Sequence, residues 1–424
     1  MDPVFTTLGA VLGLAVAVAL VLLRMSPAYA LMAGAVVGGI AGGGGISATV
    51  SHAISGAQGM MPAVLRILAS GVLAGALIKT GSAERLAGTV VDTLGRRFAV
   101  AAIALATLIV CSVGVFIDIS VITVAPIALA VARKAGLSVG GVLLAMIGGG
   151  KAGNIISPNP NTIATAESFN VNLTSLMAAN IIPAAVALLV TVVLAGWLAG
   201  RGASPVEGMQ AEADRTGAAG ESLLPSLWSA LAGPVAVIAI LALPQVFGVM
   251  VDPFIALPAG GVVSVAATGR MKQMLKFAEY GLSKVVGVAV LLVGTGTVAG
   301  IVKASALQGD VVALLRACHL PAFVLAPVSG IMMAGATAST TAGATIASQT
   351  FSSSLLEAGV PACAAAAMLH AGATVVDSLP HGSFFHATGG AAGMDIRSRL
   401  RLIPYEAAIG LSSTAAAVAL YLMK

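Results

Sequence analysis

The chain has 424 residues, of which 58% are hydrophobic and only 9% are charged. Soluble domains carry roughly 25% charged residues, so the composition excludes a soluble globular protein and predicts an all-α, polytopic membrane protein. The net charge of +5 does not indicate a nucleic-acid partner, because the positive charges are dispersed between apolar runs. The three cysteines have no metal-ligand spacing, which argues against a zinc site or a disulfide framework.

Apolar runs at the start of the chain predict transmembrane spans near residues 4–23, 29–46 and 60–79. The first run is long enough to cross a bilayer, and it is preceded by Asp2 without a basic residue. We therefore expect it to be retained as a helix and not cleaved as a signal peptide. Residues 82–97 place acids and bases at helical spacing, which predicts an amphipathic helix on the membrane surface.

A long apolar run at residues 98–133 predicts a re-entrant hairpin. It is too long for one span and barely enough for two, and basic pairs flank both ends, which places both ends on one face. The tip falls near residues 114–120 and carries Asp118. That carboxylate either couples transport to protons or stabilises the start of the helix after the tip, near Ile119.

The next run, at residues 139–170, is interrupted between Gly150 and Thr162 by the sequence Gly-Lys-Ala-Gly-Asn-Ile-Ile-Ser-Pro-Asn-Pro-Asn-Thr. A helix cannot continue through Pro158 and Pro160, because each proline lacks a backbone donor and its ring clashes with the preceding turn. Inside a membrane, the carbonyl groups that such a break frees must face protein or a polar cavity. The sequence therefore predicts a solute site at a broken transmembrane helix.

Polar side chains around this break are candidates for solute binding. Amides and hydroxyls beside free carbonyls suit either the hydroxyl groups of a polyol or a small cation. A lysine inside an apolar segment offers its charge either to an anionic solute or to an acid of the protein. The candidates are Lys151, Asn154, Ser157, Asn159, Asn161 and Thr162.

A span at residues 176–199 completes the first half, and a polar linker at residues 200–226 separates it from the second half. The second half repeats the same order of parts. We expect spans near 228–247, 254–268 and 285–302, a surface segment at 310–316, a re-entrant hairpin at 320–356, a broken helix at 361–393 and a last span from residue 404.

The two halves align with a nearly constant offset. An offset of 222 pairs Pro158 with Pro380, and an offset of 225 pairs the segment Gly71–Gly75 with Gly296–Gly300. Each half then crosses the membrane five times, and an odd number of crossings inverts the second copy. We therefore predict two inverted-topology repeats, residues 1–199 and 227–424. Most of the lysines and arginines lie on the face that holds the linker, which predicts a cytoplasmic linker and periplasmic termini.

Polar residues of the second hairpin tip and the second break complete the predicted binding site. They are Ser339, Thr340, Thr341, Ser378 and His381. Asp377, just before this break, either caps the following half-helix or takes part in proton coupling. Half-helices that begin after each break and each tip point their positive ends toward the cavity, which favours an anionic solute. The histidines have no local ligand spacing, so we expect no metal and no other cofactor.

The segment from Gly150 to Thr162 resembles the gluconate permease family of bacterial inner-membrane proton symporters, and the hydrophobic layout agrees over nearly the whole chain. The resemblance implies proton-coupled uptake of gluconate or a related sugar acid. It also implies the architecture of a wider ion-transporter superfamily, with inverted repeats, re-entrant hairpins, homodimers and elevator-type movement. The Ser-Asn-Thr tip motif of that superfamily is not found here, which leaves proton coupling through Asp118 or Asp377.

Other functions stay open at this point. Family members also carry other small hydroxy acids or D-serine, and a sodium-coupled dicarboxylate carrier would have the same architecture. An intramembrane enzyme with Asp377 and His381 as an acid and base pair is a rival of another class. Against it, Pro380 interrupts the helical turn between them and no nucleophile with oxyanion donors is evident.

Overall fold

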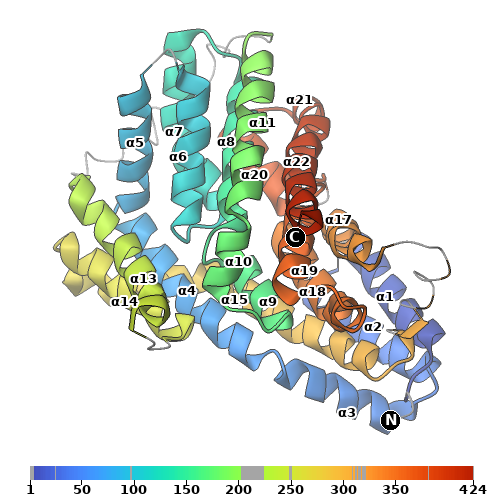
Figure 1. Cartoon of the computed structure of the whole chain (residues 1–424). Coiled ribbons are helices and arrows are strands. Elements are labelled where there is room, and N and C mark those ends of the chain that lie inside the picture. Colours follow the sequence, from blue (N-terminus) through green and yellow to red (C-terminus); the bar gives the residue numbers. More distant parts are fainter. Residues whose placement is uncertain are drawn as a thin grey trace.

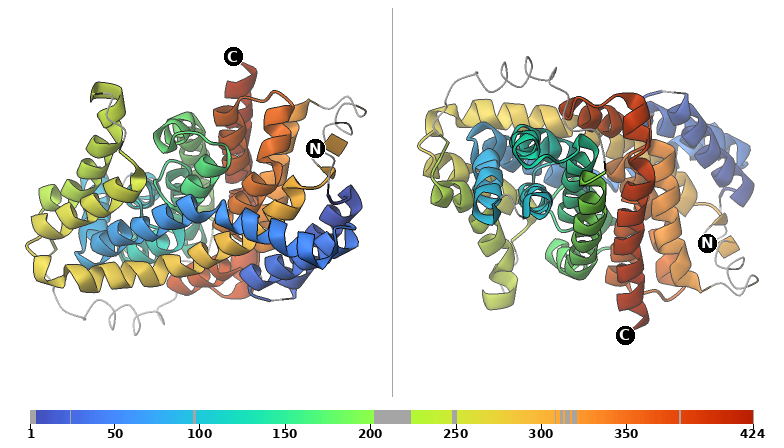
Figure 2. Two further views of the ribbon diagram at one scale, coloured as in Figure 1. Left: turned by 90° about the horizontal axis from the view of Figure 1, so that it is seen from below. Right: turned by 90° about the horizontal axis from the view of Figure 1, so that it is seen from above.

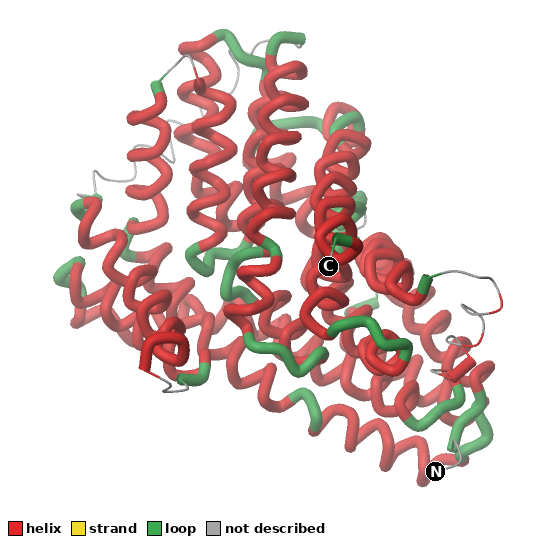
Figure 3. The backbone as a smooth tube through the Cα atoms, viewed as in Figure 1, coloured by secondary structure: helices red, strands yellow, loops and turns green. Residues whose placement is uncertain are grey.

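The structure is a computed structural model of the chain, and its regular structure is helical (Figures 1 and 3). It describes residues 4–23, 25–95, 98–201, 224–247, 251–307, 309–310, 313, 317, 321–380 and 382–423. Five helical segments among these residues are long and apolar enough to cross a membrane, namely Met61–Lys79, Val139–Ser168, Ile181–Ala199, Met271–Lys303 and Ile396–Leu422. Most of the linker and most of the predicted surface segment at 310–316 lie outside the described residues.

One layer of the molecule is built from the first spans of each half. Its helices are α1 (Thr7–Leu22), α2 (Pro27–Ala41), α3 (Gly45–Gln58), α4 (Met61–Lys79), α13 (Leu227–Phe247), α14 (Pro253–Ala267) and α15 (Met274–Lys303). Helices α1 and α2 pack closely, because a methyl group on Gly13 would lie 2.6 Å from the carbonyl oxygen of Gly34. The spans expected near 4–23, 29–46, 60–79, 228–247 and 254–268 are all helical in the structure.

Two elements of this layer differ from the sequence expectation. Helix α3 was not expected, because its serines, threonine, histidine and glutamine lower the hydropathy of residues 45–58. Helix α15 begins at Met274, well before the expected residue 285. Its first turns carry lysine and glutamate, which reduce hydropathy but are good helix formers. Hydropathy therefore located the spans but not the full lengths of the helices.

Helix α15 runs antiparallel to α3 and α4 along the base of the molecule, and it meets both of these helices at glycines (Figure 2, left). A methyl group on Gly281 would lie 1.8 Å from the carbonyl oxygen of Gly71. One on Gly56 would lie 2.1 Å from the carbonyl oxygen of Gly296. These backbones approach too closely for any side chain at the contact, as is typical of small-residue packing between membrane helices.

The second layer holds two helical hairpins and two broken helices. The hairpins are α6 (Ala99–Ser112) with α7 (Ile117–Ala135), and α17 (Leu325–Thr337) with α18 (Thr340–Glu357). The broken helices are α8 (Val139–Ile155) with α9 (Pro160–Ser168), and α19 (Ala362–Gly372) with α20 (Ser383–Ala391). Figure 3 shows the non-helical tips and breaks between these helices as loops.

The boundaries at two functional positions differ from the expectation. Helix α7 begins at Ile117 and not near Ile119, so Asp118 lies in its first turn. The second break is longer than predicted, because α19 already ends at Gly372. The chain beyond α19 lies against α22, where a methyl group on Gly410 would come within 2.5 Å of the Cα atom of Val375.

The remaining helices enclose the second layer. They are α5 (Ser82–Leu94), α10 (Leu173–Ala179), α11 (Ile181–Ala199), α21 (Ile396–Leu400) and α22 (Ile403–Leu422). Helix α5, predicted as a surface helix, buries one face against the first hairpin and α13. Arg399 of α21 is fully buried, pairs with Glu406 of α22 and donates to Thr388 of α20, so it fixes the connection between these three helices.

The glycine contact between α4 and α15 makes a direct prediction about stability. The substitution Gly281→Ala should lower the free energy of unfolding by about 1–3 kcal/mol, because the added methyl group overlaps the α4 backbone. The control is Gly287→Ala on the same helix, where an added methyl group meets nothing within 4 Å. Thermal unfolding in detergent measures both, and equal midpoints for the two variants would contradict the predicted role of the contact.

Candidate solute and coupling site

The first break is held together by its own side chains. The Asn159 side-chain amide donates to the backbone carbonyl of Asn154 at 2.9 Å, a carbonyl that the break frees. Its oxygen accepts from the backbone N–H of Thr162 at 3.2 Å and so caps α9. The hydroxyl of Ser157 donates to the carbonyl of Cys111 on the first hairpin at 2.7 Å. These four polar residues stabilise the break before any solute arrives.

A buried ion pair joins the first broken helix to the second break. The Nζ atom of Lys151 lies 2.5 Å from the Oδ1 atom of Asp377, and each side chain is only 1% exposed. Lys151 also donates to the carbonyl of Thr374. The other carboxylate oxygen of Asp377 accepts from Thr340 at 2.5 Å, and Ser378 donates to Oδ1 at 3.1 Å. Hydroxyl donors therefore supplement the pairing of the two buried charges, as a buried ion pair requires.

A second polar cluster lies where α9, α18 and α19 meet. The side-chain nitrogen Nδ2 of Asn161 lies 2.8 Å from Nε2 of His370. The hydroxyl of Thr341 donates to the amide oxygen of Asn161 at 3.5 Å. His370 is fully buried. Because the amide oxygen already accepts from Thr341, the amide nitrogen donates to His370, whose Nε2 atom is then unprotonated.

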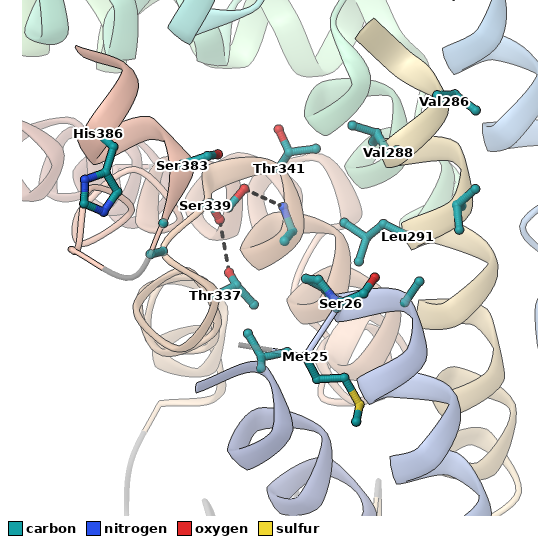
Figure 4. Close-up of a pocket in the computed structure, with 18 of the residues that line it drawn as sticks. Met25, Ser26, Val286, Val288, Leu291, Thr337, Ser339, Thr341, Ser383 and His386 are labelled. Atoms are coloured by element: carbon teal, nitrogen blue, oxygen red, sulfur yellow. Dashed lines mark hydrogen bonds between the residues drawn. The ribbon is translucent and has the colours of Figure 1, made fainter. Parts of the chain in front are cut away.

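A cavity of about 750 Å³ lies beside these clusters (Figure 4). The hydroxyls of Ser339, Thr341 and Ser383 face it, and apolar side chains of α15 lie across from them. The volume is in the range of small-molecule sites. Its further lining includes Met25, Ser26, Thr337, Pro380 and His386. The cavity therefore lies between the second hairpin tip, the second break and the helices of the other layer.

Two helices begin at this cavity. The hydroxyl of Ser339 caps α18 by accepting from the backbone N–H of Ala342 at 3.2 Å. Helix α20 begins after Gly382, and no side chain caps it. The N–H groups of its first turn have no partner within the helix, and the positive end of the helix dipole adds to their attraction for an anion.

The structure places the predicted site residues in three groups. Ser339 and Thr341 line the cavity, whereas Thr340, Ser378, Asp377 and Lys151 form the buried cluster behind its wall. Asn154, Ser157, Asn159 and Thr162 are occupied in holding the first break, and Asn161 joins the cluster of His370. His381 lies outside the described residues.

Asp118 lies apart from the ion pair. Its carboxylate lies in the first turn of α7, one residue after the start of this helix at Ile117. A carboxylate in the first turn stabilises the helix start, which was one of the two predicted roles.

The sequence interpretation gave His370, Ser383 and His386 no part in the site. The structure places Ser383 and His386 on the cavity wall and His370 in contact with Asn161. The available signal was a histidine inside the otherwise apolar helix Ala362–Gly372, since such a residue normally faces a polar partner.

Another ionic cluster lies where α4, α9 and α14 approach one another. The guanidinium group of Arg66 contacts both oxygens of Asp252, at 2.7 Å from Nη2, and pairs with Glu167. Hydrogen bonds from Arg66 hold the pKa of Asp252 below its usual range. A cavity of about 400 Å³ is lined by these three residues and by Asn170 and Asn172. Glu167 is partly exposed here.

Comparison with known proteins decides the family. The model of the family described as GntP family permease matches residues 4–401. The chain belongs to the GntP permease family. This confirms the resemblance predicted from the Gly150–Thr162 motif. An uncharacterized transporter of Haemophilus influenzae is 50% identical over 409 residues, which cover 96% of each chain.

The fold of this GntP family permease is also that of a solved transporter. The crystal structure of the Alcanivorax borkumensis YdaH transporter, described as revealing an unusual topology, superposes with a TM-score of 0.63. The sequences are 16% identical, and the match covers 88% of this chain and 87% of that one. The permease is therefore a multi-pass membrane transporter of a small solute and not an enzyme.

The buried ion pair predicts a specific pattern of stability. Either Lys151→Met or Asp377→Asn should lower the free energy of unfolding by about 3–5 kcal/mol. The first variant leaves the buried charge of Asp377 without a partner, and the second leaves that of Lys151 without one. The double variant should recover most of that loss, since neither charge remains. Thermal unfolding of the four proteins gives the coupling, and simple additivity of the two losses would contradict the pairing.

Proposed function

We propose that this permease is a secondary active transporter that imports gluconate or a related sugar acid together with protons. The observation that carries this proposal is the neutral, buried pair of Lys151 and Asp377 beside a polar cavity at which two helices begin. A sugar acid has one carboxylate and several hydroxyls. The helix starts suit the carboxylate, and the side-chain hydroxyls of the cavity wall suit the polyol.

The ion pair suggests how the proton and the anion are coupled. The Asp377 side chain accepts from Lys151 and from two hydroxyl donors. If Asp377 takes up a proton, the charge of Lys151 is left without a partner, and the carboxylate of the solute can replace it. One proton and one monovalent anion then bind together, and the site is neutral both before and after they bind. This exchange avoids the cost of an unpaired charge inside the membrane.

Asp377 serves as the coupling acid better than Asp118 does in this proposal. Asp377 is paired with Lys151, the only lysine of the broken helices. It also accepts from Thr340, which directly precedes the cavity-lining residue Thr341 in the sequence. Asp118 lies in the first turn of its own helix. We assign Asp118 the stabilising role of the two that the sequence allowed.

The proposal retains two inverted repeats, and the glycine contacts of the first layer support it. With the offset of 225 residues, Gly71 of the first half is equivalent to Gly296 of the second, and Gly56 is equivalent to Gly281. The contact of Gly71 with Gly281 is therefore equivalent to the contact of Gly296 with Gly56, and the structure contains both contacts. A two-fold axis between the halves produces such an exchange. The predicted cytoplasmic linker, the periplasmic termini and the homodimer belong to the same proposal.

Transport in proteoliposomes tests the proposed function. Uptake of radiolabelled gluconate should rise several-fold when an inward proton gradient is imposed and should saturate with gluconate concentration. The gradient drives accumulation because each proton that enters down 100 mV contributes roughly 2.3 kcal/mol. Uptake that follows a sodium gradient and ignores the proton gradient would refute proton coupling. Transport of other small acids but not of gluconate would refute the identification of gluconate as the solute.

The exchange of partners on Lys151 makes a second prediction. In Asp377→Asn, the lysine has no carboxylate partner, so gluconate should raise the unfolding temperature of this variant more than that of the wild type. Accumulation against a gradient should be lost, while exchange of gluconate across the membrane persists. The matched variant Asp118→Asn should retain accumulation. The partner exchange would be wrong if gluconate stabilised Asp377→Asn no more than the wild type.

A further inference from the structure

Helices α9 and α18 pack side by side, and polar side chains line the contact between them. Asn161 bonds to Thr341, and seven residues further along each helix Ser168 bonds to Ser348 at 3.0 Å. Both pairs are separated by the same number of residues in the sequence, so the two helices run parallel and in register. Their contact is a continuous polar seam inside an otherwise apolar layer.

Between these two pairs, one further position on each helix faces the seam. Thr165 lies four residues after Asn161, and Thr345 lies four residues after Thr341, which is one helical turn in each case. Both threonines are fully buried, and neither hydroxyl has a hydrogen-bond partner among the described residues.

Other buried threonines behave differently. The hydroxyls of Thr107, Thr191 and Thr295 each donate to the carbonyl four residues earlier in their own helix. A buried hydroxyl without a hydrogen-bond partner costs free energy, so we expect another group inside the seam to provide a hydrogen bond to each of the two hydroxyls. Water is the usual partner of such groups in a polar interior.

The two ends of the seam have different surroundings. At one end, Ser168 is partly exposed, accepts from Gln349 and is the neighbour of Glu167 in the ionic cluster with Arg66. At the other end, Asn161 contacts His370, whose Nδ1 atom also has no partner among the described residues. The seam therefore joins a partly exposed ionic cluster to the buried start of α18, where Thr341 bonds to Asn161 and the neighbouring Thr340 donates to Asp377.

We propose that the seam between α9 and α18 is the path by which protons reach the coupling site, with water bridging its hydroxyl groups and Thr340, which donates to Asp377, as the last hydroxyl. This inference rests on the proposed proton coupling. Successive positions are about 6 Å apart along a helix axis. One bridging water with two hydrogen bonds of about 2.8 Å spans that distance.

The proton balance along this path is simple. Each water or hydroxyl accepts one proton from the outer side and releases one toward the inner side, so none of them changes its charge overall. The last hydroxyl is that of Thr340, which already donates to Asp377. It passes its proton to this carboxylate and takes up another from the water behind it, so Asp377 becomes the neutral acid and Thr340 keeps its hydroxyl.

The double substitution of Thr165 and Thr345 by valine tests the path with little change of shape. Gluconate-driven proton influx, measured with a pH dye inside proteoliposomes, should fall at least tenfold. Exchange of gluconate at equal pH on both sides requires no net proton movement and should change less than twofold. The control is Thr191→Val, in which a buried threonine outside the seam is replaced and both rates should stay near the wild-type values.

The outcomes separate this inference from the proposed function. If the wild type shows no proton coupling, the proposed function fails. If the wild type is coupled and the double variant moves protons at the wild-type rate, the path is wrong. Equal losses of proton influx and gluconate exchange, together with a lower unfolding temperature, would show that the seam only holds α9 and α18 together.

A second measurement does not depend on the solute. An experimental structure at a resolution that shows ordered water should contain water bonded to the hydroxyls of Thr165 and Thr345. Finding instead that each hydroxyl donates to the carbonyl four residues earlier, with no water in the seam, would overturn the path.

Discussion

The pairing of Lys151 with Asp377 is the interaction on which the arrangement of the second layer depends. Two unit charges removed from water are costly, and each is tolerated only while the other stays in place. The pair joins residues from the two halves of the chain, so it fixes the first broken helix against the second break. Because Lys151 also holds the carbonyl of Thr374 and Thr340 holds Asp377, the same interaction positions the tip of the second hairpin.

The two breaks are therefore stabilised in different ways. Asn159 and Thr162 satisfy the free backbone groups of the first break from within the same segment. In the described part of the second break, His386 bonds locally to the carbonyl of Pro380, and Lys151 from α8 and Thr340 from α18 hold the segment from outside. Under the proposed function, a change of protonation or of bound anion at the pair would act directly on the second break.

Much of the fold could be predicted from the sequence, because a membrane restricts a chain to a few solutions. Hydropathy located the spans, and Pro158 and Pro160 located the first break. The predictions failed where hydropathy and helix propensity disagree. Polar but helix-forming residues built α3 and extended α15, and the close contact of Gly410 with the chain after α19 lengthened the second break. Similarly, His370 was set aside because its significance depends on Asn161, which lies far away in the sequence.

The sequence by itself determined that this protein is a polytopic membrane transporter of the GntP permease family, because apolar run lengths and the broken-helix motif are local properties. It also named most of the polar residues near the site. Only the tertiary structure decided which of them face a cavity, which hold the backbone and which neutralise one another. Lys151 could equally have met a solute or an acid, and Asp118 and Asp377 were equivalent candidates. The partner of a charge depends on which helices are brought together, and that is fixed by packing across the whole molecule.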